Sequence, residues 1–371
     1  MLSYELDLTL GKDFKHTCYA IFMLTEKQIE EIREHLRKAQ NPLFFFDNDA
    51  DGLCSFLILS RWIGRGKGVA IKSFPSLDEN HSRKIYELNP DYVFVLDKPL
   101  ISKEFSEEVR KLGLPFVWID HHDLDVEVPE GVYYYNPAKI KEGNKNKSTE
   151  PVTYWAYKIT ENKEDLWLGM AGCIADNFLP DFSKNFEEKY PELWKKGVKS
   201  AFQALYETEI GRITRIMGFG LKDRTSNVVK MLKFLLKTKN PLDILEDVPS
   251  NTLLFRFGQV NKKYQKFLEK AESFAGRGKL LYFQYGGDLS LSADIANELY
   301  YRHPDKIIVV AYLAGTKANL SLRGEKVKEL TAKAIEGLEN STGGGHENAT
   351  GAKVQIEDLP KFKEKIEHLI N

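Results

Sequence analysis

The feature that most constrains this chain is an acidic hexapeptide, DNDADG at residues 47–52, that follows the apolar run PLFFF at residues 42–46. A continuous apolar run is typical of a buried parallel strand, and ligand sites lie at the carboxyl ends of such strands. If the backbone stays extended, alternate side chains share one side, so we expect Asp47, Asp49 and Asp51 to converge. Three carboxylates repel one another unless a cation lies between them, so the motif predicts a divalent metal site.

Two other interpretations of this motif are an acidic turn and a calcium loop of the EF-hand type. An EF-hand loop needs a further Gly and a Glu at its twelfth position. Here Gly52 is followed by Leu53-Cys54-Ser55-Phe56-Leu57, which favours the start of a buried helix.

Strand and helix patterns alternate through the first third of the chain. Helical spacing of apolar residues and short apolar runs follow one another, with expected helices at 26–39, 53–63, 82–88 and 102–112 and expected strands at 43–46, 69–74, 91–97 and 115–120. This order predicts an α/β fold with a doubly wound parallel sheet.

Three of the expected strands end in an acid, at Asp47, Asp97 and Asp120. One such Asp is explained by a solvated strand end, but three on neighbouring parallel strands predict a carboxylate cluster at one sheet edge. His121 and His122 follow Asp120. A lone His pair favours a solvated loop, but beside the cluster these imidazoles suit manganese, iron, cobalt or zinc better than calcium.

A fourth acid follows an apolar run rich in small residues, at 166–175. This run is typical of a tightly packed buried helix, and Asp176 lies at its end. A buried acid normally has a partner, and a metal ion fits that role.

The rest of the chain predicts two further parts. Helical spacing at 186–206, 211–217, 226–236 and 252–274 indicates a helical middle, and strands are expected again at 279–285, 306–313, 317–323 and 352–356, with helices at 295–301 and 327–338. Gly343, Gly344 and Gly345 precede His346, and we expect a shaped turn there whose N–H groups approach phosphate; a flexible linker is the alternative. The expected domains are 1–185, 186–277 and a smaller α/β domain at 278–371.

Composition limits the class of partner. With 371 residues and a net charge of -1, the chain lacks the basic balance of a duplex-DNA binder, so nucleic-acid contact is expected to be local or metal-assisted. No apolar run reaches the roughly 18 residues that span a bilayer, and no signal layout opens the sequence, so a cytoplasmic protein without membrane contact is expected. The three cysteines, Cys18, Cys54 and Cys173, are too far apart to predict a disulfide framework or zinc knuckle.

Taken in order, these segments resemble the DHH phosphoesterase superfamily with a C-terminal DHHA1 domain. The hexapeptide at 47–52 is similar to the first motif in its RecJ-like form, and the later motifs are matched at Asp97, Asp120-His121-His122 and Asp176, at SLR (321–323) and at GGGHENATGA (343–352). There are two departures. Asp47 stands where the pyrophosphatase and oligoribonuclease branches have His, and Asp176 lies in Ala-Asp-Asn rather than the commoner Gly-Asp.

The resemblance implies a two-metal centre, usually with Mn²⁺ and with Mg²⁺ or Co²⁺ as alternatives. Asp49 and Asp97, with Asp47, would hold one ion, and Asp51, His121 and Asp176 the other, with Asp97 bridging. The catalytic residues would be Asp120 and His122, of which His122 would contact the scissile phosphate. The terminal nucleotide would be held by residues of the DHHA1 domain, namely Arg323, Gly343, Gly344, Gly345, His346 and Asn348.

The implied activity is a single-strand-specific 3′→5′ exonuclease that releases nucleoside 5′-monophosphates from DNA or RNA ends. Within the superfamily, the layout resembles the archaeal Hef-associated nucleases, which implies a homotrimer that acts beside the repair helicase Hef. The alternatives are an oligoribonuclease, a 5′→3′ exonuclease of the RecJ type and an inactive scaffold like the replication factor Cdc45. All six expected ligand positions carry a competent residue type, which disfavours the scaffold.

Overall fold

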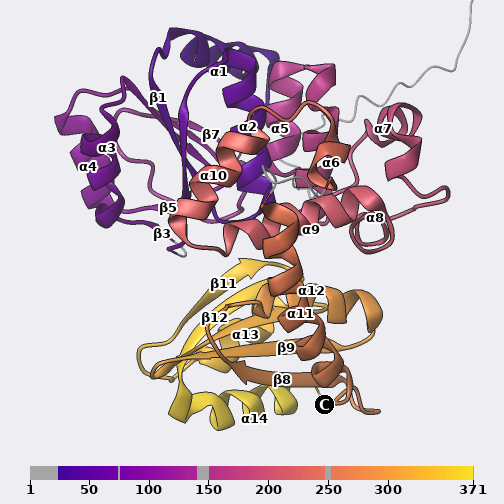
Figure 1. Ribbon diagram of the computed structural model, residues 1–371. Helices are drawn as coiled ribbons and strands as arrows, with labels where there is room; N and C mark the ends of the chain where they lie inside the picture. The colour runs from indigo at the N-terminus through magenta and orange to yellow at the C-terminus, as the bar shows by residue number, and fades with distance from the viewer. Residues whose placement is uncertain (1–23, 74–75, 140–149, 247–251, 371) are drawn as a thin grey trace, which may run out of the picture.

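The protein is seen in a computed structural model that describes residues 24–73, 76–139, 150–246 and 252–370. Its elements form two bodies, each built around a five-stranded sheet, and the long helix α11 (Leu253–Glu272) runs from the first body to the second (Figure 1). No described helix combines the length and the apolar character needed to cross a membrane.

The first sheet is entirely parallel, with the strand order β2-β1-β4-β6-β7. Its strands are β1 (Pro42–Asp47), β2 (Lys67–Ile71), β4 (Tyr92–Leu96), β6 (Phe116–Ile119) and β7 (Val132–Tyr135). The short strands β3 (Ser76–Leu77) and β5 (Leu100–Ile101) form a separate parallel pair. The prediction of a doubly wound parallel sheet is confirmed, although β7 was not expected.

Both faces of this sheet are buried because its central strands are apolar along their length. Phe44 and Phe46 pack on the face covered by α1 (Glu26–Lys38), α2 (Ala50–Ile63), α5 (Val152–Thr160) and α6 (Leu166–Ala175). Leu43 and Phe45 pack on the other face, in the core that includes Phe105 of α4 (Lys103–Lys111) and Ile85 of α3 (Arg83–Leu88). Alternate side chains of one strand therefore supply two separate cores.

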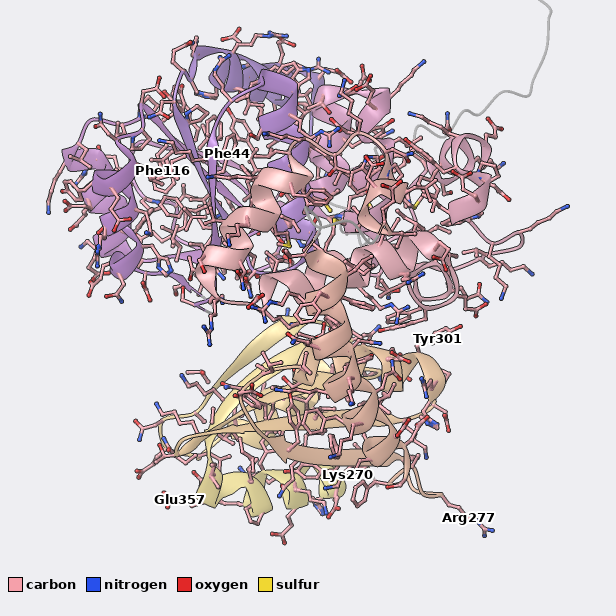
Figure 2. All side chains as sticks on the ribbon, in the orientation of Figure 1. Phe44, Phe116, Lys270, Arg277, Tyr301 and Glu357 are labelled. Carbon is pink, nitrogen blue, oxygen red and sulfur yellow. The ribbon has the colours of Figure 1, made fainter. Side chains whose placement is uncertain are left out.

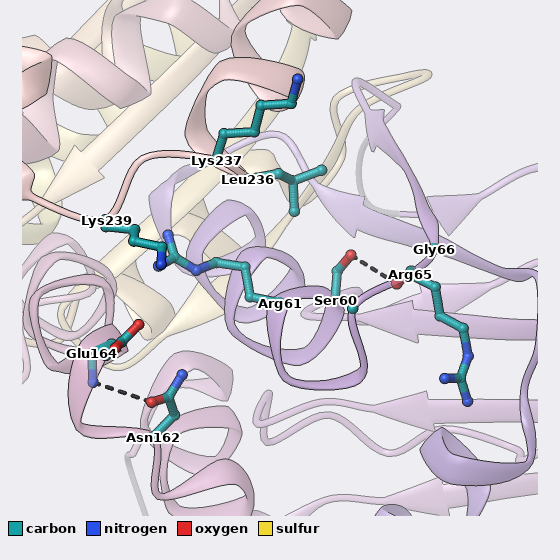
Figure 3. A pocket seen from close by; sticks show the side chains of 10 residues that line it. Ser60, Arg61, Arg65, Gly66, Asn162, Glu164, Leu236, Lys237 and Lys239 are labelled. Atoms are coloured by element: carbon teal, nitrogen blue, oxygen red, sulfur yellow. Dashed lines mark hydrogen bonds between the residues drawn. The ribbon is translucent and has the colours of Figure 1, made fainter.

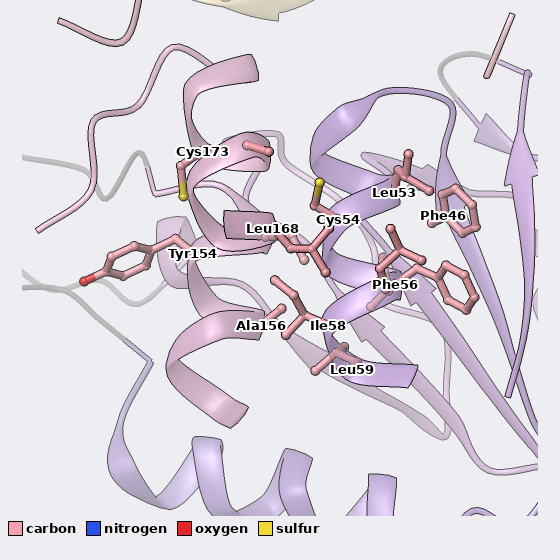
Figure 4. Packing of buried hydrophobic residues seen from close by; sticks show 14 of the residues in the cluster. Phe46, Leu53, Cys54, Phe56, Ile58, Leu59, Tyr154, Ala156, Leu168 and Cys173 are labelled. Carbon is pink, nitrogen blue, oxygen red and sulfur yellow. The ribbon is translucent and has the colours of Figure 1, made fainter. Parts of the chain in front are cut away.

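The face under α2 is the larger core. Figure 4 shows Phe46 and Phe56 together on the sheet side, and Leu168 and Cys173 of α6 approaching Cys54 of α2. Cys54 and Cys173 are buried free thiols, and Cys18 lies outside the described residues.

The strand order places a topological switch point between β1 and β4. The chain leaves β1 through α2 to β2 on one side, and then crosses to β4 on the other side of β1. Crossovers that diverge in this way open a crevice at the carboxyl ends of the two strands, where open α/β sheets bind ligands. Asp47 ends β1, and Asp97 directly follows β4.

The middle of the chain is helical, as predicted. Its helices are α7 (Ser183–Lys189), α8 (Ala201–Glu207), α9 (Glu209–Leu221), α10 (Thr225–Leu235) and α11. The expectation of one helix over 186–206 is wrong, because α7 ends at Lys189 and a single 3₁₀ turn starts at Pro191. Proline has no N–H to donate and disfavours helical backbone in the residue before it.

The second sheet has the order β11-β12-β10-β9-β8, antiparallel except for the β8–β9 pair. Its strands are β8 (Leu280–Gly286), β9 (Ile307–Ala314), β10 (Lys317–Arg323), β11 (Thr342–His346) and β12 (Ala349–Gln355). Helices α11 and α12 (Ser292–Arg302) pack on one face, and α13 (Val327–Ile335) and α14 (Leu359–Ile370) pack on the other. In Figure 2, Lys270, Arg277 and Glu357 lie on the outside of this second body.

One expectation about the glycine run is corrected here. Residues 343–345 do not form a turn but lie within β11, the edge strand, which pairs with β12. The turn comes after them, between His346 and Ala349.

Candidate metal centre

The acidic hexapeptide does not stay extended, so the prediction that Asp47, Asp49 and Asp51 alternate along a strand is wrong. Asp47 ends β1, Asp49 is the N-cap of α2 and accepts a hydrogen bond from the Gly52 N–H (3.0 Å), and Asp51 already lies in the first helical turn. Asp is favoured at N-caps because its side chain accepts bonds from the free N–H groups of the first turn. The carboxylates are brought together by the change from strand to helix at this point, and not by alternation along an extended strand.

Asp97 is the residue around which these acids gather. It is 2% exposed and adopts left-handed backbone (φ 58°), a conformation that costs energy for residues other than Gly and is concentrated at functional sites. Its carboxylate belongs to three potential metal-binding groups, one with Asp47 and Asp49, one with Asp51 and His121 and one with Asp120 and His122, in each of which the ligand atoms lie within 4.8 Å of one another.

His121 connects Asp97 to the remaining acids. Its Nε2 lies 3.3 Å from Asp97 Oδ1, 3.9 Å from Asp51 Oδ2 and 3.6 Å from Asp176 Oδ2. Asp176 is the C-cap of α6, as its position after the apolar run suggested. All six residues predicted as metal ligands therefore lie in one cluster.

Asp51 has a structural task as well. It is buried, and its two oxygens accept hydrogen bonds from the N–H groups of Val152 (2.9 Å) and Thr153 (2.7 Å), at the start of α5. The carboxylate thus caps a helix that is distant in the sequence, in place of Pro151, which makes no side-chain cap bond. Both oxygens keep lone pairs for a further partner.

Asp120 and His122 form a dyad beside the cluster. His122 Nδ1 lies 2.8 Å from Asp120 Oδ1, and Asp120 Oδ2 accepts hydrogen bonds from the His122 N–H and the Asn136 side chain, both at 3.2 Å. Burial alone would lower the pKa of His122, but the Asp120 charge and hydrogen bond outweigh it and raise this pKa to about 9. In the metal-free protein, the His122 ring is therefore protonated at neutral pH and paired with the Asp120 carboxylate.

The clustered carboxylates disfavour one another's ionisation in the metal-free protein. Burial, reinforced by the neighbouring acids, raises the pKa of Asp49 to about 7 and that of Asp176 to about 6, and raises the pKa of Asp97 well above its ordinary value. Asp49 nevertheless keeps much of its side chain open to solvent, and water and counter-ions there screen part of the repulsion.

The donor set fits divalent cations. Carboxylate oxygens with one imidazole nitrogen suit Mn²⁺ and similar ions, and a carboxylate shared between two groups is what a pair of ions needs. Raised pKa values are also expected where several acids share one site without the positive charge that would balance them. One ion would be held by Asp47, Asp49 and Asp97, and a second by Asp51, Asp97, His121 and Asp176.

Two residues at this site were missed from the sequence. Asn136 follows β7 and donates hydrogen bonds to Asp120, the His122 carbonyl and the Tyr134 hydroxyl. Lys98 is fully buried, and its Nζ lies 2.7 Å from Asp47 Oδ1. An isolated lysine or asparagine carries no periodic signal, although Lys98 directly follows a strand-end Asp.

The second body brings His346 to the cluster. The ring centres of His346 and His122 are 5.0 Å apart with their planes at 24°, and His346 lies 5.5 Å from His121. The Arg323 charge acts on Asp176 and opposes the rise in the pKa of that acid. Arg323 also donates hydrogen bonds to the carbonyls of Leu322 and Thr350, which fix its position.

The other predicted substrate residues lie beyond His346. Gly343, Gly344 and Gly345 lie on the outer edge of the sheet, where alternate N–H groups of an edge strand have no partner strand. Asn348 lies in the following turn, where its side-chain oxygen accepts a hydrogen bond from the Lys326 N–H (3.3 Å) and its carbonyl accepts one from the Gly324 N–H.

A hollow of about 540 Å³ lies elsewhere, at the far end of α2 (Figure 3). Its two arginines are already bonded: Arg61 pairs with the buried Asp165 (2.8 Å), and Arg65 donates to the carbonyls of Ala39 and Arg37. It lies at the opposite end of α2 from the carboxylate cluster and shares no lining residue with it, so we place the candidate site at the cluster.

The fold and this set of side chains define a class: an α/β protein with a parallel sheet, a cluster of carboxylates and imidazoles at the carboxyl ends of its strands, and a second sheet domain behind it. The family model of the DHHA1 domain matches residues 277–371, so the second body of this chain is a DHHA1 domain. A search of curated proteins found no match.

Solved structures share this fold at low sequence identity. RecJ from Thermus thermophilus in complex with Mn²⁺ has a TM-score of 0.63 and 17% identity, over 92% of this chain and 54% of RecJ, so this chain spans about half the length of that protein. A structure of the exonuclease RecJ bound to manganese gives 0.60 and 16%, over 92% and 93% of the two chains. The DHH domain of a protein described as a member of a family of ribosomal proteins gives 0.65 and 14%, over 93% and 89%.

Proposed function

We propose that this protein is a metal-dependent phosphodiesterase that removes nucleotides one at a time from the 3′ end of single-stranded nucleic acid, releasing nucleoside 5′-monophosphates. The observation that carries the proposal is that Asp97 belongs both to the group with Asp47 and Asp49 and to the group with Asp51 and His121, and also forms a third group with the Asp120–His122 dyad. Manganese in two solved RecJ structures supports Mn²⁺ as the ion, with Mg²⁺ or Co²⁺ as alternatives.

In the proposed reaction, bound divalent cations supply a nucleophile at neutral pH and stabilise charge on the leaving oxygen. The protein contributes position and charge. Asp97 and the surrounding acids fix the ligand geometry, Asp120 holds the His122 ring, and Asn136 donates a hydrogen bond to Asp120. The positive His122 ring would face the phosphodiester and offset the negative charge that develops on it in the transition state.

The DHHA1 domain would hold the end of the strand. His346 reaches the dyad from β11, and the outward-facing N–H groups of the Gly343–Gly345 edge strand and the Arg323 guanidinium are donors suited to a phosphate. Because these donors lie across from the carboxylate cluster, they set a fixed distance between the bound terminus and the reacting bond. Such an arrangement favours attack near a strand end and a single strand over a duplex.

The experiment that tests this function is digestion of a single strand labelled at one end, with each metal in turn. We expect Mn²⁺-dependent loss of nucleotides from the 3′ end and no digestion in EDTA. Loss from the 5′ end instead would support a 5′→3′ exonuclease of the RecJ type, and no cleavage with any metal would contradict the proposal and favour an inactive scaffold.

Substrate length separates the exonuclease from an oligoribonuclease. We expect a long single strand and a dinucleotide, at equal concentration, both to be cut. The proposed contacts of the DHHA1 domain hold only the end of the strand and so set no limit on its length. If only the dinucleotide is cut, the oligoribonuclease is the correct function. DNA and RNA versions of the same strand, compared in this assay, identify the preferred nucleic acid.

His346 tests the role of the second domain. We expect His346→Ala to weaken binding of the strand end more than it weakens binding of Mn²⁺, since the three potential cation groups that contain Asp97 lie in the first domain and His346 belongs to a fourth, with His121 and His122. Equal losses of strand-end binding and Mn²⁺ binding would contradict this assignment of separate roles to the two domains.

A homotrimer acting beside a repair helicase such as Hef belongs to the same proposal, and light scattering of the purified protein tests the trimer.

A further inference from the structure

The Lys98 side chain is the unusual feature of the cluster. It is fully buried, and its ammonium group donates to Asp47 Oδ1 and to the Ser73 carbonyl, each at 2.7 Å. Its own carbonyl accepts a hydrogen bond from Trp118 Nε1 (2.8 Å), which fixes the backbone that positions it. Lysine is almost never fully buried unless it is paired, because removing its charge from water is costly.

The pairing has a consequence for Asp47. Oδ1 also accepts the Asn48 N–H (2.9 Å), so this oxygen is bonded twice within the protein. Among the described residues, Oδ2 accepts no hydrogen bond, and it remains for a cation shared with Asp49 and Asp97. Lys98 therefore determines which oxygen of Asp47 is offered.

We propose that Lys98 is a positioning residue that acts as a built-in counter-cation of the metal centre. It orients Asp47 as a one-oxygen ligand and offsets part of the charge of the clustered acids before any metal ion enters. The inference rests on the proposed two-cation centre and adds a residue that the centre needs in its metal-free state.

If Lys98 has this role, removing its charge should lower the stability of the metal-free protein and raise its affinity for Mn²⁺. Without Lys98, the acids of the metal-free protein repel one another with less compensation, so its stability falls. The same loss removes a positive charge next to the incoming ion, so Mn²⁺ binds more tightly. Loss of Lys98 also frees the Asp47 carboxylate to rotate, which would weaken Mn²⁺ binding. We expect the removal of the positive charge to affect the Mn²⁺ affinity more, because a bound ion itself fixes the Asp47 carboxylate.

Lys306 offers a matched control. It is also buried, at 9% exposure, and its Nζ also donates to backbone carbonyls, those of Gly276 (2.8 Å) and Gly278 (2.6 Å), but it lies in the second body. A lysine with only a structural role should therefore behave as Lys306 does.

The test compares Lys98→Met and Lys306→Met by thermal unfolding in EDTA and in Mn²⁺, and by calorimetric titration with Mn²⁺. We expect Lys98→Met to melt on the order of 5–10 °C lower in EDTA, to recover most of this loss in Mn²⁺, and to bind Mn²⁺ about tenfold more tightly. We expect Lys306→Met to lose the same amount in both conditions and to leave the affinity unchanged.

A double variant provides a second stability measurement if Lys98→Met does not fold in EDTA. Asp47→Asn combined with Lys98→Met removes both charges of the pair, and it should be clearly more stable in EDTA than Lys98→Met. The inference is overturned if Lys98→Met loses equal stability in EDTA and Mn²⁺, or if the double variant is no more stable. If the wild-type protein itself binds no Mn²⁺, the proposed function fails instead.

Discussion

Single residues at the site each carry two tasks. Asp51 caps α5 through two backbone N–H groups and belongs to a metal-binding group, and Asp49 caps α2 and belongs to the other. The carboxylates are therefore held in place by the same hydrogen bonds that start the helices. A site built on helix starts and strand ends is more rigid than one built on loops, which is what a fixed ligand geometry requires.

The Asp120–His122 dyad leads to a prediction about pH. The charge and hydrogen bond of Asp120 are the main causes that raise the pKa of His122, to about 9 in the metal-free protein, so Asp120 favours the protonated ring. In Asp120→Asn the raising charge is gone, and we expect the alkaline limb of the pH profile of kcat/KM to move toward lower pH. The measurement is the Mn²⁺-dependent rate from pH values near neutral to well above the His122 pKa, and an unchanged alkaline limb would contradict a role for the charged ring.

The same pair also affects stability. The pKa of His122 in the folded protein lies above its value of about 6.5 in the unfolded chain. The Asp120–His122 pair therefore contributes its full stabilisation of the fold at pH values below about 6.5. This contribution is lost as the pH rises through about 9.

At the scale of elements, the close packing of α2 against the end of β1 shapes the centre. A Cβ added at Gly52 would lie 2.5 Å from the Asp47 carbonyl oxygen and 2.7 Å from the Asp47 nitrogen. No larger residue fits there without moving the strand end, which explains the glycine that closes the acidic hexapeptide.

Gly52→Ala tests this packing. We expect a loss of about 1–3 kcal/mol in unfolding free energy, because backbone atoms must shift, together with weaker Mn²⁺ binding as Asp47 is displaced. Gly218 in α9 is the control, because a Cβ there meets nothing within 4 Å, and Gly218→Ala should be neutral or stabilising by up to about 1 kcal/mol. Chemical denaturation measures the unfolding free energy of both variants. Equal stabilities for the two would show that the close contact between Gly52 and the Asp47 backbone does not contribute to stability.

The sequence predicts these elements well where one physical pattern dominates. The apolar strand runs and their terminal acids identify the parallel sheet, and neighbouring parallel strands then bring Asp47, Asp97 and Asp120 to one edge. Asp49 and Asp51 were assigned correctly to the cluster but for the wrong reason, because capping by Asp49 starts α2 at Ala50, earlier than apolar spacing indicates. The glycine run was expected as a turn because strand pairing with β12 is a long-range interaction that local composition does not contain.

On the scale of the whole molecule, the two bodies meet at the cluster. Helix α11 packs with α12 against the second sheet and also contacts α9 of the first body (Figure 1). His346 of the second sheet adjoins the dyad of the first. Substrate binding and metal binding would therefore lie on opposite sides of one interface. A cation at the cluster affects the stability of the molecule because it offsets charges that folding brings together.

The melting temperature should consequently depend on pH in the metal-free protein and depend on it less when metal is bound. In the folded, metal-free protein the pKa values of Asp49 and Asp176, about 7 and about 6, exceed their unfolded values, so folding takes up protons in this range. We expect the melting temperature in EDTA to fall as the pH rises from about 4 to about 7, and Mn²⁺ to remove this loss, because the ion binds the deprotonated acids.

Asp49→Asn provides the comparison for this effect. With one acid neutralised, the fall of melting temperature with pH in EDTA should be smaller than in the wild-type protein. Identical slopes in the two proteins would show that the clustered carboxylates do not cause the pH dependence.

The proposed function requires Asp97 to be shared by two divalent cations. The number of Mn²⁺ ions bound per chain tests this directly, measured by equilibrium dialysis and metal analysis on the wild-type protein and on Asp97→Asn. We expect two ions for the wild type and fewer than one for Asp97→Asn, whose melting temperature in EDTA should be no lower, since a buried like charge has been removed. Two tightly bound ions in Asp97→Asn, or none in the wild type, would contradict this requirement.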